Sequence, residues 1–291
     1  MKHRSRRVAT PLPFPRGVIS ADGAAASGGA SQSVRDATLA DAAHVVLSSV
    51  QKSYGEIEAI RDASFALTAG EFVSVLGPSG CGKSTLLMMI AGLISPSAGE
   101  ITVGGSQVRG PRREIGIAFQ SPVLLPWRSI IDNVLFPIEM LKLPRRTFLP
   151  RAIELLEMVK IGEFARKLPR ALSGGMRQRA AICRALIHDP TLLLMDEPFS
   201  ALDAMTRDEM GLELLRIWQA NRKSVLFVTH SIREAAFLSD RVLVMGRRPA
   251  SMIAEIRIDT PRPRRLEMME HPDFNAYVRE LRNAIEASHA A

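Results

Sequence analysis

Residues 77–84 read Gly-Pro-Ser-Gly-Cys-Gly-Lys-Ser, with an apolar run at residues 72–76 before them and apolar residues at helical spacing after them. This order fits the phosphate-binding pattern G-x-x-x-x-G-K-[ST] in its strand-loop-helix setting. Glycines let backbone N–H groups wrap around phosphates, and the positive end of the following helix points at the same place. A glycine-rich turn that binds nothing is the alternative, but the flanking strand and helix count against it. The stretch therefore predicts a nucleoside triphosphate site.

Within this loop, we expect Lys83 to reach the β- and γ-phosphates and the Ser84 hydroxyl to ligate Mg²⁺. The residues expected to contact the nucleotide here are Gly77, Pro78, Ser79, Gly80, Cys81, Gly82, Lys83, Ser84 and Thr85. By itself the loop specifies only a nucleoside triphosphate, so other segments must indicate which kind of protein binds it.

Three more apolar runs, at residues 115–119, 192–195 and 225–228, have the composition of strands buried on both faces of a parallel sheet. Polar side chains follow each run directly. They are Gln120, Asp196, Glu197, Thr229 and His230. Ligands of open α/β sheets bind beyond the carboxyl ends of the strands, so these side chains should converge on the phosphate loop.

Asp196 and Glu197 are adjacent carboxylates at the end of a predicted buried strand. Asp196 suits the Mg²⁺ shell, directly or through water, and Glu197 suits the polarisation of an attacking water molecule. Adjacent acids at a strand end are also common as helix caps or solvated turns. Their occurrence together with a phosphate loop favours the catalytic interpretation.

Residues 172–179 read Leu-Ser-Gly-Gly-Met-Arg-Gln-Arg, which resembles the signature peptide of ATP-binding-cassette (ABC) ATPases. Alone, a Ser-Gly-Gly turn could be an ordinary helix N-cap. Its position supports the resemblance, because Ser173 lies 89 residues after Ser84 and 23 residues before Asp196. The resemblance covers roughly residues 44 to 245. It implies the ATP-hydrolysing subunit of an ABC transporter.

The resemblance implies an α/β fold with a P-loop NTPase (RecA-like) core, a small antiparallel β subdomain and an inserted α-helical subdomain. Tyr54 is then expected to stack on adenine. Gln120 would contact Mg²⁺ and link the nucleotide to the membrane partner, and His230 would contact the γ-phosphate. The catalytic residues implied in this way are Glu197, His230 and Gln120.

The resemblance also implies a head-to-tail dimer that ATP holds together. The nucleotide on the phosphate loop of one subunit is covered by a second subunit. The residues of the second subunit that would contact it are Ser173, Gly174, Gly175 and Gln178, with Asp203 in the dimer-contact loop at residues 200–203.

Composition suggests how the chain is divided. Residues 1–43 are rich in Ala, Ser, Gly and Arg without sustained apolar periodicity, which predicts a disordered tail. Residues 44–245 would form the ATPase domain, with a proline-punctuated helical insertion at about residues 121–172. Residues 246–291 predict a C-terminal extension made of a strand and an amphipathic helix.

The net charge of +8 would suit nucleic acid or an anionic membrane surface, but two basic clusters lie near the ends of the chain. Because chain ends exposed to solvent account for both basic clusters, no nucleic-acid partner is expected. The two cysteines, Cys81 and Cys183, have no metal-binding spacing and suggest neither a disulfide nor a zinc site. No run approaches the roughly 18 apolar residues that span a bilayer, so we expect a membrane link only through a partner.

Two local features resemble the importer branch for nitrate, sulfonates, taurine and related small solutes: residues 125–127, Leu-Pro-Trp, and the Pro-Arg run at residues 261–264. A loop anchor and a solvated linker are their alternative interpretations. The implied partners are a second ATPase subunit in a homodimer, an integral membrane permease and, indirectly, a periplasmic or extracellular solute-binding protein. The chain would then be peripheral at the cytoplasmic face of the cell membrane.

Two other functions are alternatives to transport. A non-transport ABC ATPase of DNA repair or translation usually carries long coiled coils, zinc modules or two cassettes, and none is evident in the sequence. A nucleotide kinase or GTPase would share the phosphate loop, but the peptide at residues 173–179 argues against it.

Overall fold

The computed structural model describes residues 43–221 and 223–290. The described residues belong to one compact unit. The predicted disordered tail, residues 1–43, thus lies outside the described residues except for Ala43, where the first strand begins.

A ten-stranded sheet runs through the unit in the order β5-β4-β1-β2-β10-β9-β3-β8-β7-β6. Its strands are β1 (Ala43–Tyr54), β2 (Ile57–Thr68), β3 (Phe72–Leu76), β4 (Ala98–Val103), β5 (Ser106–Gln107), β6 (Ile115–Ala118), β7 (Leu192–Asp196), β8 (Ser224–Thr229), β9 (Arg241–Met245) and β10 (Ala250–Arg257). Strands β9, β3, β8, β7 and β6 are parallel neighbours, whereas β5, β4, β1 and β2 pair antiparallel. Strand β10 connects the two parts, antiparallel to β9 and parallel to β2. The expected parallel core with a smaller antiparallel part is confirmed.

Helices cover both faces of the parallel core, and some lie beside the sheet, packed on other helices. They are α2 (Lys83–Ile90), α3 (Ile130–Met140), α4 (Arg145–Met158), α5 (Gly174–Leu186), α6 (Ala204–Asn221), α7 (Ile232–Leu238) and α8 (Pro272–Ala290), with 3-10 turns η1 (Gly162–Phe164), η2 (Pro169–Ala171) and η3 (Leu266–Glu270). In β3, Phe72 belongs to an apolar cluster that includes Trp218 of α6. The next residue, Val73, belongs to a cluster that includes Leu86 of α2. Successive residues of a strand point to opposite faces, so burial on both faces requires the continuous apolar runs seen in the sequence.

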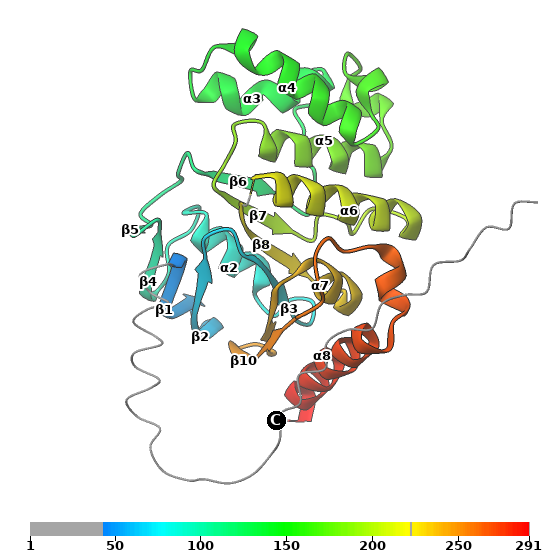
Figure 1. Ribbon diagram of the computed structural model, residues 1–291. Helices are drawn as coiled ribbons and strands as arrows, with labels where there is room; N and C mark the ends of the chain where they lie inside the picture. The colour runs from blue at the N-terminus through cyan, green and yellow to red at the C-terminus, as the bar shows by residue number, and fades with distance from the viewer. Residues whose placement is uncertain (1–42, 222, 291) are drawn as a thin grey trace, which may run out of the picture. The chain divides into compact units, whose positions relative to one another are not determined.

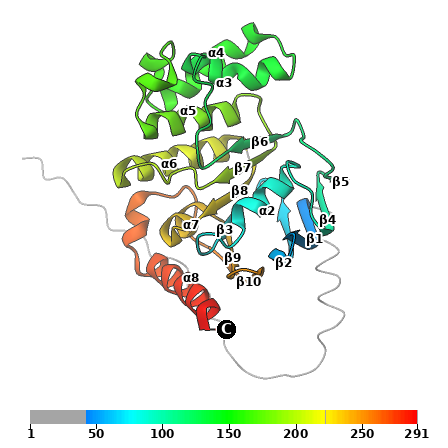
Figure 2. The same cartoon turned by 180° about the vertical axis from the view of Figure 1, so that it is seen from behind.

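Helices α3, α4 and α5 lie together on the β6 side of the sheet, with α5 nearest to it (Figures 1 and 2). At the start of α3, Ser129 Oγ caps the helix by accepting a hydrogen bond from Asp132 N at 3.3 Å. Near the other end of the chain, Phe274 and Leu281 of α8 are buried in the larger apolar cluster. The domain limits stay a prediction. No helix among the described residues combines the length and apolar composition required to cross a bilayer.

Candidate active site

The phosphate loop joins the end of β3 to the start of α2, and its shape depends on glycine. A Cβ on Gly77 would lie 2.5 Å from the Met245 carbonyl oxygen, so a larger residue cannot fit. Gly82 has φ of +117° and is the N-cap of α2, where it offers no side chain to the first N–H groups of the helix. These backbone N–H groups are therefore available to an anion at the positive end of the helix.

Lys83 is the first residue of α2, and only 4% of its surface is exposed. Its Nζ donates to the carbonyl oxygens of Gly77 at 3.0 Å and Pro78 at 2.9 Å. It also lies 3.9 Å from Glu197 Oε1. A buried ammonium needs such partners, and together they hold the charge inside the curve of the phosphate loop.

Asp196 ends β7 and is buried, with one oxygen that lacks a partner. Its Oδ1 has no hydrogen-bond partner within the part of the chain that the structure describes. Burial raises the pKa of Asp196, and a hydrogen bond from Ser84 acts in the opposite direction. A buried carboxylate oxygen without a donor, next to a hydroxyl, fits a divalent cation that prefers oxygen ligands, such as Mg²⁺.

Glu197 lies at the centre of the predicted catalytic residues. Its Oε2 accepts a hydrogen bond from Gln120 Nε2 at 3.3 Å and lies 2.9 Å from His230 Nδ1. Gln120, Glu197 and His230 follow β6, β7 and β8, so the expected convergence at the carboxyl ends of the strands is confirmed. Glu197 also has φ of +42°, an uncommon backbone conformation for a residue with a side chain. Such conformations are concentrated at functional sites.

Tyr54 ends β1 and pairs with Ile57 of β2 at the tip of a hairpin. The residue is 48% exposed, and Lys52 Nζ lies 4.9 Å from the ring centroid. Further along β2, Ile60 Cγ1 would lie 3.3 Å from a Cβ on Gly82. The hairpin therefore runs beside the phosphate loop and carries an exposed aromatic ring, while its stacking on adenine stays a prediction.

The signature residues form a separate surface. Ser173 is the exposed N-cap of α5, and its Oγ accepts a hydrogen bond from Met176 N at 3.3 Å. A Cβ on Gly175 would lie 2.9 Å from Leu202 Cδ2, so the signature residues pack against the loop at residues 200–203. Both views show α5 away from α2 (Figures 1 and 2). Ser173, Gly174 and Gly175 are thus not brought to the phosphate loop of the same chain.

Gln178 does not lie where the resemblance placed it. Its side chain is fully buried, and its Nε2 donates to the Phe119 carbonyl oxygen at 3.0 Å. The expectation that Gln178 contacts the nucleotide is wrong, because α5 turns this side chain toward β6 instead of the surface. Phe119 directly precedes Gln120, so Gln178 fixes the strand end that carries Gln120. Asp203, directly before α6, binds the backbone of that helix: its Oδ1 accepts a hydrogen bond from Thr206 N at 3.0 Å.

Arg248, which lies in the connection between β9 and β10, was not predicted from the sequence. Its Nη2 donates to the Gly80 carbonyl oxygen in the phosphate loop at 3.0 Å. Strand β9 pairs with β3, so the residues after β9 meet the loop after β3. The basic pair Arg247-Arg248 after an apolar run can be seen in the sequence. Its position beside the phosphate loop, however, follows only from the strand order.

Known proteins are similar to this chain in sequence and in fold. The family model described as ABC transporter matches residues 60–200. The chain is 48% identical over 207 residues to the taurine import ATP-binding protein of Rhizobium johnstonii, covering 71% of this chain and 79% of that protein. It is 45% identical over 214 residues to an aliphatic sulfonates import ATP-binding protein of Burkholderia cenocepacia, covering 74% of this chain and 78% of that protein.

The fold is also similar to the ATP-binding cassette MJ0796, solved as a dimer in a post-hydrolysis state bound to ADP and Pi. The TM-score is 0.68 and the sequence identity is 32%, and the match covers 75% of this chain and 100% of that chain. The fold and site define a P-loop ATPase. The chain belongs to the ABC transporter family, as one of its ATP-binding proteins.

Proposed function

We propose that this ATPase powers the import of a small solute of the nitrate, sulfonate and taurine class through a membrane permease. The identity to import ATP-binding proteins for taurine and aliphatic sulfonates supports this proposal. The chain would be peripheral at the cytoplasmic face of the membrane, and a solute-binding protein would deliver the solute to the permease. The alternative function in DNA repair or translation has no such support.

The proposed chemistry is carried by the Glu197 carboxylate and its contacts with Gln120, His230 and Lys83. Glu197 would orient and polarise the attacking water as a general base. His230 would contact the γ-phosphate, and Lys83 would leave its carbonyl partners to bind the β- and γ-phosphates. Gln120 and His230 already contact the Glu197 carboxylate, which supports this assignment.

Mg²⁺ would be held by Ser84 and Asp196, with Gln120 close enough to Glu197 to contribute from the neighbouring strand end. Among the described residues, no group of three His, Cys, Asp or Glu side chains could hold a metal ion alone. Phosphate oxygens would therefore have to complete the shell, as is usual for Mg²⁺. The ion would supply positive charge that offsets the charge on the β- and γ-phosphates.

The proposed site is completed by a second copy of the chain. Helix α5, whose N-cap is Ser173, lies away from α2 of the same chain (Figures 1 and 2), which supports the proposal that Ser173, Gly174 and Gly175 cover the nucleotide of a partner. The solved MJ0796 dimer supports this arrangement. Hydrolysis would remove γ-phosphate contacts and release the two subunits, and the Gln120 loop would pass this change to the permease.

The loop after Gln120 would be the docking surface for the permease. Trp127 in this loop is 73% exposed, so it does not anchor the loop within the subunit. The loop backbone is held from inside: Leu125 N donates to Asn133 Oδ1 at 2.7 Å, and Arg184 Nη1 donates to the Val123 carbonyl oxygen at 2.8 Å. A fixed backbone that presents an aromatic ring to solvent suits an interface.

Uptake by cells tests the proposed function. In the source organism, loss of this gene should abolish uptake of labelled taurine, an aliphatic sulfonate or nitrate. The wild-type chain should restore that uptake, and Glu197→Gln should not. Unchanged uptake of all three solutes would contradict the proposed solute class. A DNA-repair or translation defect in these cells would support the alternative function instead.

A further inference from the structure

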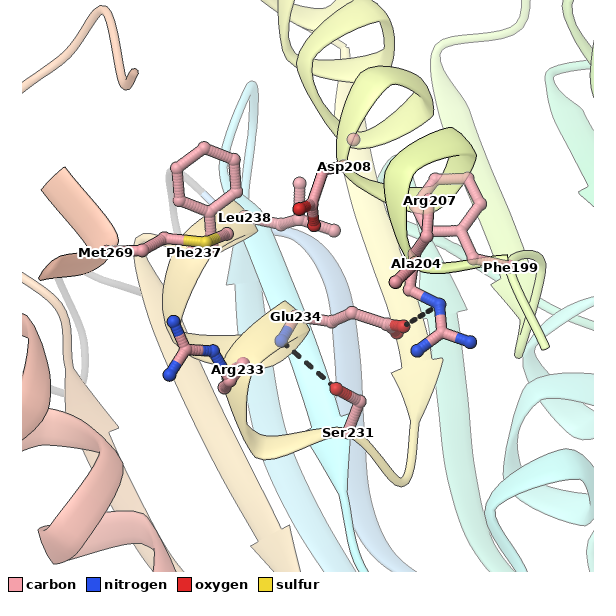
Figure 3. A pocket seen from close by; sticks show the side chains of 11 residues that line it. Phe199, Ala204, Arg207, Asp208, Ser231, Arg233, Glu234, Phe237, Leu238 and Met269 are labelled. Carbon is pink, nitrogen blue, oxygen red and sulfur yellow. Dashed lines mark hydrogen bonds and ion pairs between the residues drawn. The ribbon is translucent and has the colours of Figure 1, made fainter. Parts of the chain in front are cut away.

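A pocket of about 230 Å³ lies between the start of α6 and α7, and two opposite charges face each other across it (Figure 3). Arg207 comes from α6 and Glu234 from α7, and Arg207 Nε lies 3.4 Å from Glu234 Oε1. The pocket is bordered on one side by Ala204, directly after the loop at residues 200–203, and on the other by Ser231, directly after His230. It therefore lies next to both His230 and the dimer-contact loop.

On the α7 side, Glu234 fixes the residues on both sides of His230. Thr229 Oγ1 donates to Glu234 Oε2 at 2.7 Å, and it accepts a hydrogen bond from Ser231 N at 2.9 Å. Ser231 Oγ in turn accepts from Glu234 N at 3.3 Å, as the N-cap of α7. The backbone that carries His230 is thus held at both neighbours by bonds that involve Glu234.

On the α6 side, Arg207 reaches the dimer-contact loop. Its Nη2 donates to the Leu202 carbonyl oxygen at 3.1 Å. Leu202 is the residue that packs against Gly175 of the signature surface. A continuous set of contacts therefore runs from the surface proposed to meet the second subunit, through Arg207 and Glu234, to the backbone of His230.

The Glu234 carboxylate depends on these few partners, because its side chain is only 15% exposed. Burial raises the pKa of Glu234, and the hydrogen bond from Thr229 and the charge of Arg207 oppose this effect. A desolvated carboxylate is sensitive to any movement of its cationic partner. A displacement of the dimer-contact loop would thus change the forces on Glu234.

We propose that Glu234 and Arg207 are positioning residues for ATP hydrolysis that link the His230 backbone to the dimer-contact loop within one subunit. Approach of the second subunit to this loop and contact of His230 with the γ-phosphate then favour each other, since coupling between two sites is reciprocal. The link rests on the proposed role of His230 and on the proposed dimer.

The test is to measure kcat and KM for Mg-ATP in Glu234→Gln, Arg207→Gln and the double variant. Gln has the same shape as Glu and keeps an acceptor for Thr229, so only the charge pairing is lost. We expect kcat to fall about fivefold to tenfold in each single variant, with KM within about twofold of the parent. The double variant should lose no more than the worse single variant, because either change alone breaks the same link.

Glu209→Gln is the matched control, since it removes the carboxylate of another α6 ion pair, 2.8 Å from Lys160 Nζ. It should keep the parental kcat, and thermal unfolding should show that all four variants are folded. Parental kcat in Glu234→Gln, losses that multiply in the double variant, or an equal loss in Glu209→Gln would each overturn the link.

His230→Ala, measured in parallel, separates the link from the proposed role of His230. If His230→Ala hydrolyses ATP at the parental rate, the role of His230 is wrong and the link falls with it. If His230→Ala is inactive while Glu234→Gln is fully active, only the link is wrong. Loss of activity in both variants, with the non-additive pattern above, supports the link.

Discussion

The phosphate loop and the signature loop both precede a helix, yet their helix N-termini are built differently. At α2, Gly82 leaves the first N–H groups without a side-chain cap, and the charges around them are buried. At α5, the exposed Ser173 caps its own helix by accepting from Met176 N. An uncapped N-terminus offers its N–H groups to an anion, whereas a capped one on the surface is a stable shape that a partner can meet. The N-terminus of α2 is therefore suited to bind the nucleotide, and the N-terminus of α5 is suited to contact a second subunit.

The largest effect is expected on the phosphate-loop side, from Glu197→Gln. The substitution keeps size and hydrogen bonding but removes the basic oxygen, so hydrolysis should fall by roughly 10² or more while ATP binding survives. Size-exclusion chromatography with Mg-ATP should then show a stable dimer. Lys83→Ala should weaken nucleotide capture itself and leave monomers, because a charge-assisted phosphate contact is lost.

A parental hydrolysis rate in Glu197→Gln would contradict the assignment of Glu197 as the general base. His230 would then be the first candidate to replace it, because its Nδ1 lies 2.9 Å from the same carboxylate.

Trp127→Ala extends the comparison to a third region, the exposed loop that contacts neither the nucleotide nor the second subunit in our account. Removing an exposed aromatic anchor should weaken assembly with the permease by about tenfold to thirtyfold, and ATP affinity of the isolated subunit should not change. Co-purification with the permease and equilibrium nucleotide binding measure the two effects. Ile253→Ala, an exposed apolar residue of β10, is the control and should affect neither. Reduced ATP affinity with intact assembly would place Trp127 in the nucleotide site or core.

On the signature side, Ser173→Ala is expected to act in two separable ways. Loss of the cap should destabilise the fold by about 1 kcal/mol. Loss of a nucleotide contact across the dimer should also lower kcat by about tenfold, while monomers bind ATP as before. Ser129→Ala is the matched control, because Ser129 caps α3 with the same 3.3 Å bond and should show only the stability loss. Equal kcat losses in both variants would mean that Ser173 is a cap alone.

The smallest effect is expected at Arg248, which steadies the phosphate loop through the Gly80 carbonyl. Arg248→Ala should raise KM for Mg-ATP by about threefold with little change in kcat, the scale of one exposed hydrogen bond. Arg247→Ala removes the same charge from the neighbouring position. If both variants raise KM equally, long-range attraction of ATP explains the effect, and the bond to Gly80 does not.

Whether a feature could be predicted from the sequence depends on whether its contacts are local or join distant parts of the chain. The phosphate loop and the strand that precedes it are local patterns, and the polar residues after β6, β7 and β8 converge because parallel strands end at one edge. The direction of Gln178 depends on how α5 is turned toward β6, which its motif does not specify. Arg248 and the pair of Arg207 and Glu234 depend on which strands and helices become neighbours. These contacts join residues far apart in the chain, so no local pattern indicates them.

In the proposed dimer, each hydrolytic site combines the phosphate loop of one subunit with the signature surface of another. Mixing two inactive variants tests it directly: Lys83→Ala, with an intact signature surface, and Ser173→Arg, with an intact phosphate loop. In a mixed dimer, one site would join the two intact halves, so an equimolar mixture should regain ATPase activity, up to about a quarter of the parental rate if subunits pair at random. If each site were complete within one subunit, the mixture would be no more active than the two variants measured separately. That result would contradict the account.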